Sequence, residues 1–166
     1  MILIAAVNNN WGIGKGNDLL YHISEDMKFF RSKTKDNVII IGRKTLESFP
    51  GGKPLKNRVN IVLTSDKNYN AEDTVICNSI SEVLEKIKEY SDKKIYLCGG
   101  EKVYCEFLDY CDTALITKVF DDKDAEKFLV NLDEAANWDL TDTSEILEED
   151  GLRFQFCTYK NTSVKN

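Results

Sequence analysis

Asp26 is the residue whose place in the chain points most directly to chemistry. On a helix it would share a face with Ile23, Phe29 and Phe30, which lie three and four residues away. A carboxylate on this apolar face is either a first-turn acid, with Ser24 as the N-cap and the helix dipole beside it, or a buried group that binds a polar ligand. This segment alone leaves both explanations open.

A glycine-rich segment precedes Asp26 and follows an apolar run. Gly12, Gly14 and Gly16 form G-x-G-x-G, which lacks the final spacing of a dinucleotide fingerprint. We therefore expect a flexible loop after a buried strand, either able to approach a ligand closely or simply loose. Ligands usually bind beyond strand ends in open α/β sheets.

Two more apolar runs end in glycine followed by a helical pattern. Ile39–Ile41 leads into the sequence Gly42-Arg43-Lys44-Thr45, and Ile95–Cys98 leads into Gly99-Gly100. Free N–H groups at a helix start favour anions, although Arg43 and Lys44 could equally be solvated basic residues. Two such places suggest a ligand with two ends, such as a dinucleotide. The hydroxyls of Thr64 and Ser65 after Val62–Leu63 could take another phosphate.

His22 and Arg58 are the remaining candidates for chemistry. His22 is the only histidine and has a pKa suited to proton transfer, but no nucleophile or acid is arranged with it as a triad. Arg58 precedes an apolar run and is either an ordinary edge charge or a bidentate carboxylate clamp.

Composition excludes several classes of protein. The chain has 166 residues, 42% of them hydrophobic, which predicts one domain over residues 1–161 and a polar tail over 162–166, with disorder confined to Asn161–Asn166. The net charge of −6 argues against nucleic-acid and membrane partners. No apolar run reaches the ~20 residues of a membrane helix, and Met1–Val7 carries no basic leader. The five cysteines contain no C-x-x-C pair, so we expect free thiols, a cytoplasmic location and no bound metal.

The elements that must position these residues follow from periodicity. Continuous apolar runs predict strands buried on both faces, over Ile2–Val7, Val38–Ile41, Asn60–Leu63, Val75–Cys77 and Ile95–Cys98. Helical patterns cover Glu25–Lys33, Arg43–Ser48, Ser81–Tyr90 (with Ser81 as a possible cap) and Glu101–Leu108. Later strands are expected over Thr113–Val119, Trp138–Ile146 and Leu152–Lys160, the last two joined by a turn at Glu148–Gly151. The expected fold is a single α/β domain with a mostly parallel central sheet, an antiparallel C-terminal hairpin and helices on both faces.

Taken together, these residues resemble the dihydrofolate reductase family over nearly the whole chain. The similarity comprises Ile4-Ala5-Ala6, Ile13-Gly14, Asp26 with Phe30, Gly42-Arg43-Lys44-Thr45, Glu47-Ser48, Pro54-Leu55 with Arg58, Asn60–Thr64, Gly99-Gly100, Val103-Tyr104 and Thr117. No single segment is decisive, but their order and spacing are specific.

The resemblance implies hydride transfer from NADPH to C6 of 7,8-dihydrofolate and protonation of N5. Asp26 would bind the pterin 2-amino group and N3, with Thr117 supporting it, and water admitted by the Gly12–Ile23 loop would supply the proton beside Tyr21. Arg58 would clamp the glutamate α-carboxylate. The other substrate contacts implied are Ile4, Ala6, Met27, Phe30, Phe49, Leu55, Cys98 and Tyr104, although plain core packing explains any one of them alone.

The implied NADPH site has three parts. Arg43, Lys44 and Thr45 would meet the phosphates, and Thr64, Ser65 and Lys102 would receive the 2′-phosphate. Gly99-Gly100 carries a cis peptide in the family. The other implied contacts are Ala6, Ile13, Gly14, Asn17, Leu19, Gly42, Leu63, Cys98, Glu101, Val103 and Tyr104.

The chain departs from the family pattern in three places. Leu20-Tyr21 stands where the family usually has proline and tryptophan, which changes the expected water route. Ala125–Val130 replaces a stretch whose acid steadies the active-site loop, so that Glu126 is the candidate for this role. Cys98 replaces a common isoleucine or valine.

Two other functions fit the same pattern. One is a reductase of the same fold acting on another heterocycle, such as a ribosylaminopyrimidine, and the other is a non-catalytic nucleotide-binding module. Asp26, Phe30 and Arg58 favour folate. We also expect a monomer that binds antifolate inhibitors.

Overall fold

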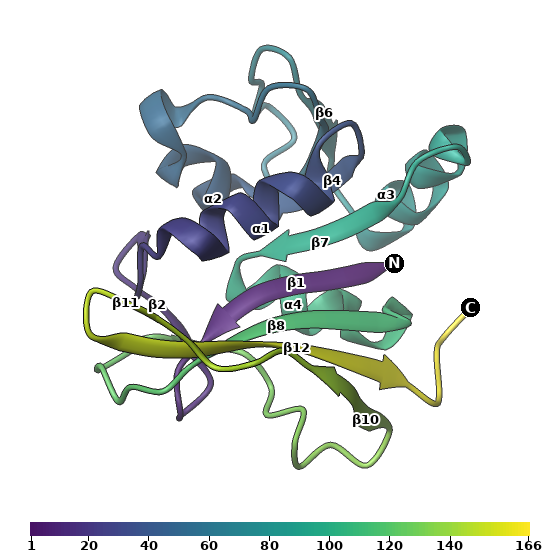
Figure 1. Ribbon diagram of the computed structural model, residues 1–166. Coiled ribbons are helices and arrows are strands. Elements are labelled where there is room, and N and C mark those ends of the chain that lie inside the picture. Colours follow the sequence, from purple (N-terminus) through teal and green to yellow (C-terminus); the bar gives the residue numbers. More distant parts are fainter.

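The computed structural model describes residues 1–166. Its main sheet has the order β10–β12–β8–β1–β7–β4–β5–β6, and β11 pairs with β12 (Figure 1). The strands are β1 (Ile2–Val7), β4 (Val38–Gly42), β5 (Val59–Leu63), β6 (Val75–Cys77), β7 (Ile95–Gly99), β8 (Thr113–Val119), β10 (Trp138–Thr143), β11 (Leu147–Glu149) and β12 (Leu152–Asn161).

The pairing confirms the predicted fold class. Strands β1, β4, β5, β6, β7 and β8 are parallel, whereas β12 is antiparallel to β8, and β10 and β11 are antiparallel to β12. The central strands form because Ile, Val and Leu follow one another without polar interruption, as in a sheet covered on both faces. Ile39, Ile40 and Ile41 of β4 are all fully buried.

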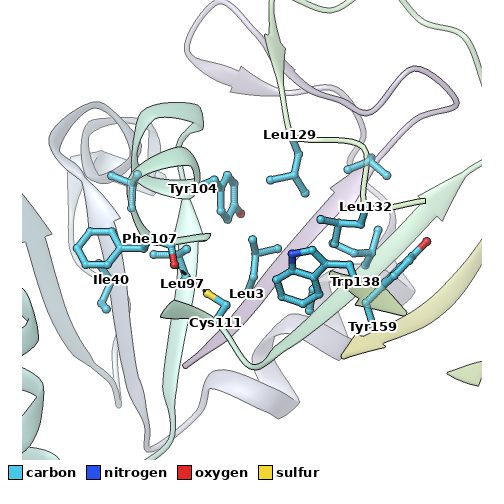
Figure 2. Packing of buried hydrophobic residues seen from close by; sticks show 14 of the residues in the cluster. Leu3, Ile40, Leu97, Tyr104, Phe107, Cys111, Leu129, Leu132, Trp138 and Tyr159 are labelled. Atoms are coloured by element: carbon cyan, nitrogen blue, oxygen red, sulfur yellow. Dashed lines mark hydrogen bonds between the residues drawn. The ribbon is translucent and has the colours of Figure 1, made fainter. Parts of the chain in front are cut away.

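Helices cover both faces of the sheet, as expected. On one face, α1 (Ser24–Thr34) and α2 (Arg43–Ser48) pack against a cluster that includes Ile4, Ile39 and Tyr96. On the other face, α3 (Ile80–Lys86) and α4 (Glu101–Phe107) pack against the larger cluster. Figure 2 shows Leu3, Leu97 and Phe107 within this larger cluster. Short 3₁₀ turns follow at Pro50–Gly52, Ile87–Tyr90 and Leu108–Tyr110.

Both predicted helix caps are wrong. Helix α3 begins one residue before Ser81, because the Ser79 hydroxyl accepts a hydrogen bond from the N–H of Glu82 and caps the helix there. Its regular part ends at Lys86, and a 3₁₀ turn continues to Tyr90. Ser24 lies inside α1 rather than at its cap, and the N-cap position is Ile23, whose side chain is apolar.

The Gly12–Ile23 segment is more ordered than the expected flexible loop. Strand β2 (Gly12–Lys15) pairs with β3 (Asp18–Leu19) and with β9 (Lys127–Phe128), which forms a small second sheet. The glycines therefore permit close strand packing as well as turning: Gly16 alone of the three has a positive φ, of 62°.

The C-terminal region differs from the prediction in two details. The expected strand Trp138–Ile146 is interrupted at residues 144–146, since the N–H of Ser144 and its hydroxyl bind Phe156 while β11 restarts at Leu147. Asn161 belongs to β12 and is buried, with its amide donating to the Cys111 carbonyl, so disorder at this residue was a wrong expectation. The turn at Asp150-Gly151 is present.

Candidate active site

The carboxyl ends of the parallel strands lie side by side at one edge of the sheet. Gly42 at the end of β4 is in register with Leu63 of β5, and Ile41 with Gly99 of β7. The sequence places a polar or flexible residue directly after each of these buried strands. The edge is therefore the place where a ligand can reach backbone groups from several strands.

The starts of α2 and α4 meet at this edge. A Cβ atom added at Gly42 would lie 3.3 Å from Cγ2 of Val103, and one added at Gly100 would lie 3.3 Å from Oγ1 of Thr45. The Gly99–Gly100 peptide bond is cis, as the family resemblance implies, and Gly99 has a φ of 113°. Any side chain at these glycines would occupy space between the two helix starts. Gly42, Gly99 and Gly100, called the glycine cradle below, therefore let the two helix starts pack closely against the strand ends.

Arg43 bridges α2 and the turn after β5. Its Nε lies 3.6 Å from Glu47, its Nη1 lies 3.9 Å from Asp66, and its guanidinium lies 5.8 Å from the centre of the Tyr69 ring. Lys44 is exposed and makes no ion pair. Two cations are thus available at this helix start, one of them partly neutralised by flanking acids.

The hydroxyls predicted to receive a phosphate lie in the turn after β5. Oγ1 of Thr64 accepts a hydrogen bond from the N–H of Asp66 at 3.2 Å, which leaves its own proton free to donate. Thr64 is buried and Ser65 is exposed.

The remaining predicted cofactor residues on α4 have other partners. Lys102 is exposed, with its ammonium 3.8 Å from Glu106, and Glu101 lies 3.9 Å from Lys127 of β9. Val103 is buried against Gly42. The Tyr104 hydroxyl donates to the Ile4 carbonyl at 2.7 Å and so ties α4 to β1. Figure 2 shows the Tyr104 ring within the larger cluster.

Asp26 forms the most informative polar contact of the site. The Thr117 hydroxyl on β8 donates to Oδ1 of Asp26 at 2.6 Å, which is the contact that the resemblance implies. Burial raises the pKa of the Asp26 carboxyl, and the hydrogen bond from Thr117 partly offsets that rise. The second carboxylate oxygen has no hydrogen bond within the protein. A half-buried carboxylate with one oxygen free can bind a ligand that presents two N–H donors.

Glu149 takes over the capping role expected of Ser24. Its carboxylate on β11 accepts hydrogen bonds from the backbone N–H groups of Ser24, at 2.7 Å, and Glu25, at 3.4 Å. These bonds hold the pKa of Glu149 below its usual range. A residue more than 120 positions away therefore fixes the helix turn that carries Asp26, and no local pattern announces it.

The apolar residues predicted to contact the substrate lie mostly on one face of the sheet. Ile4 is buried in the cluster under α1, and the half-buried side chains of Phe30, Phe49, Leu55 and Cys98 pack against that cluster. Burial raises the pKa of the Cys98 thiol, which keeps it neutral. Met27 is 42% exposed, so it lies at the outer edge of this group of apolar residues. Ala6 is in register with Thr117, which puts both at the level of Asp26.

Arg58 is fixed rather than solvated. Its Nε donates to Oγ1 of Thr34 at 2.8 Å, and Nη1 donates to the Lys56 carbonyl at 3.0 Å. Burial, and then repulsion by Arg31, lowers its pKa. The guanidinium also lies 6.0 Å from the centre of the Phe30 ring. Its remaining N–H groups can bind a carboxylate beside Phe30. Thr34, which orients it, is fully buried and was missed from the sequence.

Tyr21 has a partner that the sequence does not reveal. Its hydroxyl donates to Oδ2 of Asp121 at 2.6 Å, and the Lys123 ammonium donates to the Leu20 carbonyl at 3.0 Å. Burial, followed by the hydrogen bond to Asp121, raises the pKa of Tyr21 to about 12.

The Asn8 amide donates to the Lys123 carbonyl, while its oxygen accepts from the N–H of Gly12. Asn8 had a detectable signal, because it is a polar residue directly after a buried strand.

The remaining loop residues belong to the small sheet. A Cβ atom at Gly14 would lie 2.9 Å from the Asp18 carbonyl oxygen, so β2 and β3 pack closely there. Asn17 lies in their connecting turn, Ile13 is half-buried, and Leu19 is 54% exposed. The backbone N–H of Glu126 donates to the Gly14 carbonyl, whereas the Glu126 side chain forms no hydrogen bond. His22 is exposed and lies 3.2 Å from Asp18, outside the cleft residues.

The fold and the site together define a single-domain α/β protein with a half-buried carboxylate on α1, bound to β8, and glycines at the ends of two parallel strands. Residues 1–161 match the family model "Dihydrofolate reductase", and the chain belongs to this family. The dihydrofolate reductase of Staphylococcus haemolyticus is 38% identical over 134 residues, which is 80% of this chain and 78% of the relative. That of Bacillus subtilis is 32% identical over 164 residues, 96% of this chain and 95% of the relative.

A solved structure supports the same assignment. Dihydrofolate reductase from Enterococcus faecalis, complexed with NADP(H) and RAB-propyl, superposes with a TM-score of 0.86 at 29% identity and covers 96% of this chain and 95% of its own. No helix here is both long enough and apolar enough to cross a membrane.

Proposed function

We propose that this chain reduces 7,8-dihydrofolate to 5,6,7,8-tetrahydrofolate with NADPH and that Asp26 is the residue that recognises the pterin. A hydride is added at C6 and a proton at N5. The observation that carries the assignment is the Asp26 carboxylate, which is half-buried and accepts a hydrogen bond of 2.6 Å from Thr117. Its free oxygen and its negative charge suit the 2-amino group and N3 of the pterin.

Asp26 favours protonation at N5 through charge as well as position. A carboxylate in a poorly solvated cleft stabilises a cationic ring more strongly than it would in water. Thr117 orients that carboxylate from the neighbouring β8. We assign Thr117 a positioning role, because its hydroxyl proton is already donated to Asp26.

Water is the proposed source of the N5 proton. Tyr21 is unsuited to donate it directly, since its pKa of about 12 keeps the hydroxyl protonated and its proton is bound to Asp121. We propose that Tyr21 instead holds the loop that controls access of water to the cleft.

The cofactor residues fit NADPH, which supplies the hydride. The glycine cradle at Gly42, Gly99 and Gly100 would let the cofactor approach the backbone at the strand ends, because these residues carry no side chain. Arg43 and Lys44 would bind the phosphates, while Thr64, Ser65 and Lys102 would bind the 2′-phosphate. This assignment of the phosphate contacts is supported by Arg43, which belongs to α2 and lies 3.9 Å from Asp66, in the same turn as Thr64.

The substrate tail would leave the cleft at Arg58. The guanidinium is preorganised by Thr34 and Lys56 and stacks near Phe30, so it can bind the α-carboxylate without further ordering. A monomer located in the cytoplasm, with a domain over residues 1–161, is also proposed. Light scattering coupled to size-exclusion chromatography tests the monomer, and a mass above 19.0 kDa by a whole multiple contradicts it.

The direct test is NADPH oxidation with three additions. Dihydrofolate should give turnover that a diaminopyrimidine abolishes, whereas a ribosylaminopyrimidine should give none. Turnover of only the ribosylaminopyrimidine identifies a different reductase of the same fold. Binding of NADPH by folded protein without turnover of either substrate identifies a nucleotide-binding module.

A further inference from the structure

A polar hollow lies at the end of the sheet opposite to the glycine cradle. It has a volume of about 480 Å³ and is lined by residues just before β4 and β7, together with the last turns of α1. Its lining residues include Lys33, Ser91, Asp92, Lys93, Lys94 and Tyr96. Strands β4 and β7 have five residues each, so roughly 15 Å separates the hollow from the cofactor edge.

Tyr96 forms the floor of this hollow. Its side chain packs under α1 with Ile39 and Ile41, and only 2% of the residue is exposed. The other fully or nearly buried tyrosines donate their hydroxyl protons, Tyr104 to Ile4 and Tyr159 to Asp133, whereas the Tyr96 hydroxyl has no partner within the protein. No side-chain polar atom that is shut off from solvent lacks a hydrogen bond. The unpaired Tyr96 hydroxyl is therefore in contact with solvent, and Tyr96 is one of the residues that line the hollow.

The walls supply positive charge in a chain of net charge −6. Lys33 and Lys94 have no carboxylate within ion-pair distance, and the Lys33 ammonium lies 5.6 Å from the centre of the Phe29 ring. Lys93 is fixed by donating to the Asp36 carbonyl at 3.0 Å. Asp92 is the one acid in the lining, so the three ammonium groups leave the hollow with a net positive charge. Tyr96 and Ser91 add hydroxyl groups that can donate hydrogen bonds.

We propose that this hollow binds a phosphate group, with the Tyr96 hydroxyl as a buried donor and Lys33, Lys93 and Lys94 as the charged walls. The free groups are nearly all donors, which matches a tetrahedral dianion and disfavours a cation or an apolar ligand. Burial raises the pKa of Tyr96, so its hydroxyl stays protonated and available to donate. The site is separate from the phosphate contacts of NADPH and does not depend on the proposed reaction.

Phosphate titration followed by ¹H–¹⁵N NMR tests the proposal on protein saturated with NADPH, which occupies the cofactor phosphate contacts. At constant ionic strength, inorganic phosphate should shift the amides of residues 91–94 and of Lys33 along one saturable curve. Chloride should not. Glycerol 3-phosphate provides a second arm: binding of both identifies a site open to phosphomonoesters, and binding of inorganic phosphate alone identifies a closed phosphate site.

Two variants make the result specific. Tyr96→Phe keeps the buried ring and removes only the donor, and Lys94→Gln removes one wall charge. Each should weaken phosphate binding roughly tenfold, because each loses one hydrogen bond to a charged ligand. The control Lys88→Gln removes an exposed lysine already paired with Glu85 and should bind phosphate normally. An unsaturable shift, an equal response to chloride, or unchanged affinity in folded Tyr96→Phe overturns the proposal.

Discussion

The Tyr21 hydroxyl donates to Oδ2 of Asp121 at 2.6 Å and so joins two loops that are 100 residues apart in the chain. The same junction contains the bond from Lys123 to the Leu20 carbonyl and the bond from Asn8 to the Lys123 carbonyl. The family resemblance leads to the expectation of a tryptophan at this position, so the Tyr21 hydroxyl bond is a feature of this chain. The loop between β1 and α1 is consequently held against the segment after β8.

Tyr21→Phe should loosen this junction and slow catalysis without weakening NADPH binding. We expect kcat to fall several-fold while the dissociation constant of NADPH is unchanged, because the hydroxyl contacts Asp121 rather than the cofactor edge. Stopped-flow kinetics and fluorescence titration measure the two quantities. Asp121→Asn is the matched control, since it keeps an acceptor oxygen for Tyr21 and should be milder. A variant with normal kcat would remove any role for the junction in catalysis.

The junction also predicts a pH dependence of stability. The hydrogen bond from Tyr21, ahead of other causes, lowers the pKa of Asp121. A carboxylate with a depressed native pKa stabilises the fold above its unfolded pKa, and that contribution is lost as pH falls through the native pKa. The stability difference between the native protein and Tyr21→Phe should therefore be present at neutral pH and shrink in acid. Urea unfolding at several pH values measures it, and a pH-independent difference would mean that only packing was lost.

Asp26→Asn should reduce turnover by roughly 100-fold or more at pH 7, the scale of losing a group that assists proton transfer. The deficit should narrow as pH falls, because acid then supplies the proton that the carboxylate no longer favours at N5. NADPH affinity should stay the same, since Asp26 lies beside β8 and not at the glycine cradle. Steady-state kinetics across pH with separate NADPH titration tests both statements. Activity near normal at pH 7 is incompatible with the assigned role.

The same substitution should stabilise the fold at neutral pH. Burial raises the native pKa of Asp26 above its ordinary value of 3.8, so the native carboxylate is disfavoured once the unfolded group has ionised. The contribution of this group to the free energy of unfolding therefore falls as pH rises from the unfolded pKa to the higher native pKa. Asp26→Asn should have the larger free energy of unfolding at pH 7, with the gain disappearing in acid. Thr117→Val is the opposite control, because it removes the bond that lowers the pKa of Asp26. Lower stability of Asp26→Asn at every pH would contradict the burial argument.

The central strands could be predicted from sequence because local composition decides them. Ile2–Val7 matches β1 residue for residue, since a strand buried on both faces leaves a continuous apolar run. Thr113–Val119 also matches β8, although its run includes Thr117 and Lys118. The apolar face around Asp26 was likewise visible from helical spacing. These features depend on neighbours within a few residues.

The contacts that complete the site could not be predicted in this way. Glu149 caps α1 from β11, and Asp121 holds Tyr21 across 100 residues, so both depend on tertiary packing. Ser24 and Ser81 are typical capping residues, yet Ile23 and Ser79 occupy the cap positions, because Glu149 binds the first N–H groups of α1 and the Ser79 hydroxyl caps α3. Thr34 shows no functional pattern in the sequence, because its role depends on the hydrogen bond that it accepts from Arg58 in the folded protein.

Cofactor choice should depend on Thr64. Its hydroxyl accepts from Asp66 and has a proton left to donate, so Thr64→Ala should lower kcat/KM for NADPH by about tenfold, as expected for one hydrogen bond to a charged group. The value for NADH should change little, because NADH lacks the 2′-phosphate. Equal losses with both cofactors would show instead that the turn after β5 had been distorted. Equal use of NADPH and NADH by the unaltered protein would refute the 2′-phosphate assignment.

Strand β2 of the small sheet packs closely against the segment before β9, where Gly12 lies beside Ala125. A Cβ atom at Gly12 would lie 2.5 Å from Cβ of Ala125, closer than two such atoms can approach. Gly12→Ala should therefore cost about 1–3 kcal/mol of stability, as overpacking usually does. It should also lower kcat, because the loop that ends at Tyr21 begins here.

Ala125→Gly supplies the matching rescue. It removes the clashing atom, so the double variant should recover most of both losses, whereas Ala125→Gly alone should have a small effect. Contacts of the new methyl group with Asn8 and Leu20, at 3.0 and 3.2 Å, leave the recovery incomplete. A double-mutant cycle of urea unfolding and turnover gives the coupling between the two positions. Additive losses would mean that Gly12 is required for a reason other than its contact with Ala125.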